Sequence, residues 1–112
     1  MIETPSYDKY VFPEPWADLR GDEPGLDKRR STMVGELMSE LGPVRSRQVV
    51  ADGVEAVAMF TDHDEVLFRL GTGAFWMVHL TFAGKYDAGV RVRTISCWAE
   101  TAAVIEAMSP HR

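Results

Sequence analysis

The sequence contains a single cysteine among its 112 residues, so no disulfide can form within the chain. One unpaired cysteine is typical of proteins kept in a reducing compartment, and we therefore expect a cytoplasmic protein. Cys97 has no second cysteine at metal-binding spacing. We expect its thiol to be buried and inert.

Long apolar runs and an excess of basic charge are also missing. No apolar run approaches the roughly 18 residues of a membrane-spanning helix, which argues against a membrane protein. The first residues, MIETPSYDKYVF, lack the basic start and apolar core of a secretory signal. The net charge is −5 at pH 7. This charge argues against a general nucleic-acid binder, because such proteins depend on basic charge, whereas it permits a basic protein partner.

The most informative segment that is present predicts a β-hairpin. Two runs of alternating residues, rich in β-branched and aromatic side chains, flank Gly71, Thr72 and Gly73. The glycines supply the positive φ angles of a short loop. A three-residue loop pairs Leu70 with Ala74, Phe68 with Trp76 and Val66 with Val78. We therefore expect one apolar face, packed under helices and formed by Val66, Phe68, Leu70, Trp76, Val78 and Leu80.

The other face of the hairpin is predicted to be polar, with Glu65, Arg69, His79 and Thr81 on it. The same register sets Glu65 opposite His79, and Arg91 or Arg93 could share the face. A carboxylate beside a histidine can orient the ring for acid–base catalysis. A plain cross-strand pair, worth a few tenths to about 1 kcal/mol, is the simpler interpretation, because no nucleophile accompanies the two residues. Any function of the sheet should lie on this face.

Two helices and two further strands complete the predicted fold. Residues 26–41 carry a helical stripe of leucine and methionine that ends at Gly42 and Pro43, and residues 98–108 predict a closing helix. Gly35 lies inside the first helix, where glycine costs roughly 1 kcal/mol relative to alanine, so we expect it to allow close packing. Residues 54–60 and 90–97 predict strands. The fold class is α+β, with a four-stranded antiparallel sheet and both helices on one face.

A proline-rich N-terminal stretch, residues 1–25, precedes this single domain of residues 26–112. Proline disfavours helices and central strands, so we expect an extended arm. Its aromatic residues include Tyr10 and Trp16. The favoured interpretation is that they pack on their own domain, and the alternative is that they reach a partner.

A turn with possible metal ligands lies between two predicted strands. Asp62, His63 and Asp64 offer oxygen and nitrogen ligands that suit a divalent ion. Three adjacent side chains rarely point at one ion, and aspartate is common in turns. We therefore predict a turn, and no metal or cofactor.

The hairpin also resembles a group of small bacterial proteins without an established activity. The resemblance rests on the stretch DEVLF, residues 64–68, and on the stretch WMVHLTF, residues 76–82, followed by Gly84 and Lys85. Trp98, before the last helix, fits the same pattern, whereas Phe82 stands where the group has tryptophan. The resemblance covers residues 60–100. It implies a packed hairpin and assigns no catalytic residues.

These observations favour a non-catalytic protein-binding domain, such as an immunity protein that neutralises a toxin. The expected partner is another protein, and the acidic charge permits a basic one. The candidate binding residues are Tyr10, Trp16, Glu65, Arg69, His79 and Arg93. The alternative is a small enzyme or ligand-binding domain, in which Glu65 and His79 line a concave pocket on an open sheet face.

Overall fold

Five antiparallel strands form the centre of the fold in the computed structural model, which describes residues 5–61, 63–82, 85 and 90–108. The strands, which lie side by side in chain order, are β1 (Trp16–Asp18), β2 (Val54–Phe60), β3 (Glu65–Leu70), β4 (Phe75–His79) and β5 (Arg91–Ile95). The helices are α1 (Leu26–Leu41), α2 (Pro43–Asp52), α3 (Trp98–Met108) and the short 3-10 helix η1 (Tyr7–Lys9). The α+β class predicted from the sequence is confirmed.

The hairpin of β3 and β4 has the predicted register. The N–H of Leu70 donates to the carbonyl of Ala74 at 2.9 Å, which closes a three-residue loop. Phe68 pairs with Trp76, and Glu65 pairs with His79. Gly73 has φ 95°, the positive angle that glycine adopts without a steric penalty.

One face of the sheet packs against α1 and α2, and we call it the α1 face. Its core consists of Leu19, Met33, Leu37, Leu41, Val49, Ala56, Val66, Phe68, Leu70, Val78 and Leu80. The apolar face predicted for the hairpin is this one, with Trp76 partly buried against it. Burial of each such leucine or phenylalanine contributes about 1.5–3 kcal/mol.

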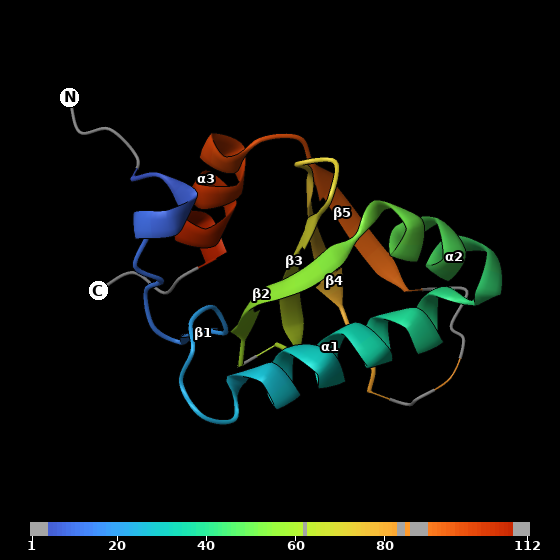
Figure 1. Ribbon diagram of the computed structural model, residues 1–112. Coiled ribbons are helices and arrows are strands. Elements are labelled where there is room, and N and C mark those ends of the chain that lie inside the picture. Colours follow the sequence, from blue (N-terminus) through green and yellow to red (C-terminus); the bar gives the residue numbers. More distant parts are fainter. Residues whose placement is uncertain (1–4, 62, 83–84, 86–89, 109–112) are drawn as a thin grey trace.

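The opposite face packs against α3 and the N-terminal segment, residues 5–20, and we call it the α3 face (Figure 1). Its core contains Tyr10, Trp16, Val57, Ala58, Phe60, Leu67, Phe75, Met77, Ile95, Ala102 and Ile105. The prediction that both helices share one face was therefore wrong. The polar face predicted for the hairpin is polar only at its ends, because Leu67 and Met77 occupy its middle and are buried, as is Phe75 opposite Arg69.

The N-terminal segment is part of the sheet rather than an arm beside it. Its residues Trp16–Asp18 form β1, which pairs antiparallel with the end of β2, so the prediction of four strands was wrong. Pro15 directly precedes β1, where proline is tolerated because β1 is a short edge strand. The side chain of Trp98 on α3 donates from Nε1 to the carbonyl of Pro5 at 2.9 Å, so the first and last described elements contact each other.

Helix α2 follows α1 after the single residue Gly42, and the sequence analysis did not predict it. Pro43, which ends α1, occupies the first turn of α2, where its missing N–H breaks no helical bond. No helix among the described residues is both long and apolar enough to cross a membrane.

Candidate functional site

A hollow of about 250 Å³ opens at one end of the α3 face. It is lined by Glu65, Met77, His79, Arg91, Val92, Arg93, Val104 and Met108. The polar groups come from three adjacent strands: Glu65 pairs with His79, and His79 pairs with Arg91. Helix α3 covers the middle of this face and forms one wall of the hollow through Val104 and Met108. Three of the residues predicted from the sequence, Glu65, His79 and Arg93, thus lie together.

Glu65 and His79 are in direct contact at this hollow. Nδ1 of His79 lies 3.2 Å from Oε1 of Glu65, and the two side chains are 37% and 22% exposed, respectively. A carboxylate oxygen accepts hydrogen bonds, so this contact favours the tautomer of His79 in which Nδ1 donates to Glu65. Nε2 is then an acceptor in the neutral ring and a donor in the cation.

The guanidinium groups of Arg91 and Arg93 belong to the exposed strand β5. Arg91 stands opposite His79, and Arg93 stands opposite Met77. Among the residues that the structure describes, neither arginine forms an ion pair. Counted over the described residues, the hollow therefore has two arginines without an ion-pair partner and one carboxylate that is in contact with His79.

Arg69, another predicted binding residue, lies elsewhere, in a larger hollow of about 600 Å³. Its guanidinium is 3.8 Å from the carboxylate of Glu55 and lies over the ring of Tyr7, 4.7 Å from the ring centroid. The hydroxyl of Tyr7 donates to Glu55 at 3.4 Å. Burial and the carboxylate of Glu55 raise the pKa of Tyr7 to about 12.

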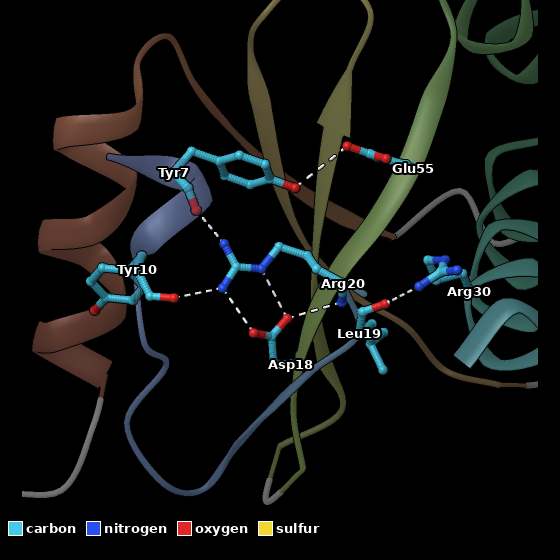
Figure 2. A network of polar contacts seen from close by, with 7 residues as sticks. All are labelled: Tyr7, Tyr10, Asp18, Leu19, Arg20, Arg30 and Glu55. Carbon is cyan, nitrogen blue, oxygen red and sulfur yellow. Dashed lines mark hydrogen bonds and ion pairs between the residues drawn. The ribbon is translucent and has the colours of Figure 1, made fainter. Parts of the chain in front are cut away.

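Arg20 holds the N-terminal segment in place beside this larger hollow (Figure 2). Its guanidinium donates to both carboxylate oxygens of Asp18, at 2.9 and 2.8 Å, and to the carbonyls of Tyr7 and Tyr10. It also lies 4.9 Å from the ring centroid of Phe12. Burial alone would raise the pKa of Asp18. The hydrogen bonds from Arg20 lower it by more, so the pKa of Asp18 lies below its usual value. The sequence analysis did not single out Arg20, whose partners are mostly backbone carbonyls and so leave no motif.

Tyr10 and Trp16 are both only 6% exposed and belong to the core of the α3 face. This is the favoured interpretation of the arm, in which the aromatic residues pack on their own domain. Burial and the nearby Glu106 raise the pKa of Tyr10 to about 12. While the N-terminal segment is docked, the side chains of Tyr10 and Trp16 are not accessible to a partner.

Glu40 of α1 is a fully buried carboxylate that the sequence analysis overlooked. It accepts hydrogen bonds from the backbone N–H groups of Thr81 and Phe82, the latter at 3.1 Å. Burial alone would raise the pKa of Glu40. Hydrogen bonds with Glu36, Thr81 and Phe82 lower it by more, so the pKa of Glu40 lies below its usual value. Glu40 thus fastens the end of the hairpin to α1, which is a structural role.

Within the described residues, the remaining candidates offer no further site. The turn after β2 is present at His63 and Asp64, while Asp62 lies outside the described residues. His63 stacks on Phe60 at 5.1 Å. Within the described part of the chain, no group of three histidine, cysteine or acidic residues is placed to hold a metal. Cys97 is exposed, so the expectation of a buried thiol was wrong.

Comparisons of the chain with protein-family models, with curated proteins and with solved structures found no match.

Proposed function

We propose that this protein is a non-catalytic binding domain, and that the hollow beside His79 binds an anionic group. The observation that supports this proposal is the charge of the hollow. The guanidinium groups of Arg91 and Arg93 line it without an ion-pair partner among the described residues, and its only carboxylate, Glu65, is in contact with His79.

The size and lining of the hollow favour a small anionic group with an apolar neighbour. At about 250 Å³ it is below the usual 300–1,000 Å³ of pockets that enclose a whole drug-sized ligand. Guanidinium groups bind carboxylate and phosphate through paired hydrogen bonds. Met77, Val104 and Met108 offer apolar contacts next to them. A carboxylate attached to a short aliphatic chain matches both features.

Among the described residues that line the hollow there is no serine, threonine or cysteine, so a hydroxyl or thiol nucleophile is not part of that lining. The contact of Glu65 with His79 supplies the parts of an acid–base pair, so the alternative proposal, a small enzyme, uses the same hollow. The two proposals differ in whether the bound anion is chemically changed.

The anionic group belongs either to a small molecule or to an acidic side chain of a protein. Proteins that neutralise a toxin are members of the same non-catalytic class, and that role remains a proposal supported by the small size and the net charge of −5. We also propose a relationship to the small bacterial proteins that share the pattern of the hairpin residues.

Titration by nuclear magnetic resonance with butyrate, with inorganic phosphate and with a short glutamate-rich peptide tests this proposal. Saturable shifts at residues 91–93 and His79 are expected. They should disappear in the double variant Arg91→Gln and Arg93→Gln and persist in Arg29→Gln, which changes an exposed arginine of α1 behind the other face of the sheet.

Comparison of the three ligands shows whether the site prefers a small-molecule anion or an acidic side chain of a protein. The spectrum of the ligand itself shows whether it is only bound or also chemically changed. A ligand whose own signals remain unchanged over hours supports binding alone. Shifts that are never saturable, or that survive the double variant, would contradict an anion site at this hollow.

A further inference from the structure

The edge of the sheet beside β1 is only partly covered. β1 pairs with residues 58–60 of β2, and the N–H of Leu19 adds a bond to the carbonyl of Val57 at 2.9 Å. The chain then turns away at Gly21, which has φ 105°. β2 begins earlier, at Val54, so residues 54–56 have β3 on one side and, among the described residues, no strand on the other.

The register shows which backbone groups face this open edge. The N–H of Gly71 donates to the carbonyl of Gly53 at 2.8 Å, and Glu55 pairs with Arg69. Backbone groups alternate in direction along a strand, so those of Glu55 point to β3 and those of Val54 point outward. The side chain of Val54 is half-buried, whereas Ala56, two residues further along β2, is only 1% exposed. Val54 is therefore the first point at which an added strand would bond.

Helix α1 forms the far wall of a groove along this edge. A hollow of about 460 Å³ is lined by Arg30, Ser31, Val34 and Gly35 of α1 and by residues 54–56 of β2. A Cβ at Gly35 would have no atom within 4 Å, so the expected close packing within the chain was wrong. A glycine in a helix interior costs about 1 kcal/mol relative to alanine. Here it leaves the helix backbone open toward the groove.

The groove continues into the hollow of about 600 Å³, which shares Arg30, Glu55 and Ala56 with it. The arginines there are engaged. Arg20 binds Asp18 and two carbonyls, Arg69 faces Glu55, and Arg30 binds Asp27 and the carbonyls of Leu19 and Gly21.

The acids of this hollow outnumber the partners available to them. Asp8 and Asp22 line it and, within the described chain, form no ion pair. Summed over the described residues that line this hollow, the net charge at this end of the groove is negative. A ligand with a cationic side chain complements it.

We propose that an extended segment of a partner protein docks in the groove between α1 and β2. Its backbone adds beside Val54 as a further strand, its apolar side chains lie against Val34 and Gly35, and a lysine or arginine side chain reaches Asp22 and Asp8. Strand addition supplies affinity through backbone hydrogen bonds and specificity through side-chain contacts. This surface is separate from the His79 hollow, which lies at β5 on the α3 face.

Titration with an acetylated Lys-Val-Lys-Val-Lys peptide, and with its Glu-Val-Glu-Val-Glu counterpart, tests the proposal. The lysine peptide should shift the amide signals of residues 53–56 and slow hydrogen exchange at Val54, and the glutamate peptide should not. Gly35→Gln, which fills the groove, should weaken binding about tenfold, because the peptide loses its path along α1. Asp22→Asn should weaken it by about threefold, an effect that salt should reduce.

Two matched controls complete the experiment. Ser39→Gln introduces glutamine, as Gly35→Gln does, but at an exposed position of α1 outside the groove, and it should leave binding unchanged. The double variant Arg91→Gln and Arg93→Gln should also bind normally, which separates this groove from the anion hollow. Equal binding of the two peptides, unchanged binding to Gly35→Gln, or no saturable binding at millimolar peptide would each overturn the proposal.

Discussion

The carboxylate of Glu40 accepts hydrogen bonds from the backbone N–H of Thr81 at 2.9 and 3.1 Å, which joins α1 to the residues just beyond β4. Helix and hairpin are far apart in the sequence, so this contact helps to set how α1 lies across the sheet.

Replacement of Glu40 by glutamine should lower the free energy of unfolding by about 2 kcal/mol, because the N–H groups of Thr81 and Phe82 would lose an ionised acceptor. Chemical denaturation measures this loss. Glu23→Gln, at an exposed position, should change stability by less than about 0.5 kcal/mol. Equal effects of the two substitutions would show that the buried carboxylate is not stabilising.

Acid should weaken the native protein through the same carboxylate. The pKa of Glu40 is lowered in the folded state, so its contribution is complete above the unfolded glutamate pKa of about 4.3 and is lost as the pH falls through the lower folded value. Denaturation midpoints measured from pH 7 downward should decline below about pH 4.3. The decline should be shallower in Glu40→Gln, and a parallel decline in both proteins would assign it to other groups.

Two glycine-to-alanine substitutions should have opposite effects. A Cβ at Gly71 would lie 1.6 Å from the carbonyl oxygen of Asp52, so the backbone must shift, and we expect Gly71→Ala to cost about 3 kcal/mol or more. A Cβ at Gly35 meets no atom, and Gly35→Ala should stabilise the helix by about 1 kcal/mol. Thermal unfolding of both variants tests the pair. A tolerated alanine at residue 71 would contradict the close approach of α2 to the hairpin loop.

Loss of Arg20 should release the N-terminal segment. Arg20→Met keeps much of the side-chain volume but removes the hydrogen bonds to Asp18, Tyr7 and Tyr10, at a cost of about 2 kcal/mol. Hydrogen exchange at Leu19, whose N–H bonds to Val57, should become faster, while exchange in β3 and β4 changes less. Arg29→Met at an exposed site is the control.

Alkaline titration should reveal two tyrosines whose pKa values are higher than that of free tyrosine. The pKa values of Tyr7 and Tyr10 are each raised to about 12. Unfolded tyrosine loses its proton near pH 10, so between about pH 10 and 12 the folded state holds more protons and its stability falls as the pH rises. Tyrosinate absorbance should show both groups titrating late, and Tyr7→Phe should remove one of them. Titration of both near pH 10 in the folded protein would exclude their burial.

The hairpin could be predicted because its signals are local. Alternation, the loop glycines and a three-residue loop were enough to give the register from Glu65 to His79. The helix over residues 26–41 and the helix over residues 98–108 were also predicted with the bounds that the structure shows. In both helices the apolar stripe lies within one short stretch of sequence, and the first helix also has a local stop signal at Gly42 and Pro43.

The features that the sequence did not reveal depend on distant residues. β1 has only three residues, too few for a periodic pattern, and forms because β2 offers it an edge. α2 buries only Val49, so it has almost no apolar stripe. The α3 face was interpreted as polar because Glu65, Arg69 and His79 mark its ends, although Leu67 and Met77 lie between them. The hollow beside His79 exists because α3 crosses that face, which no local pattern indicates.

The bond from Trp98 to the carbonyl of Pro5 has a consequence for synthesis on the ribosome. The core of the α3 face is closed by Tyr10 and Trp16 from the start of the chain and by Ala102 and Ile105 from its end. During translation the first residues emerge long before the helix against which they pack, while all buried core residues of the α1 face lie between residues 19 and 80. The buried core of the α1 face therefore needs no described residue beyond Leu80, whereas the core of the α3 face is closed only when Ile105 of α3 has been synthesised.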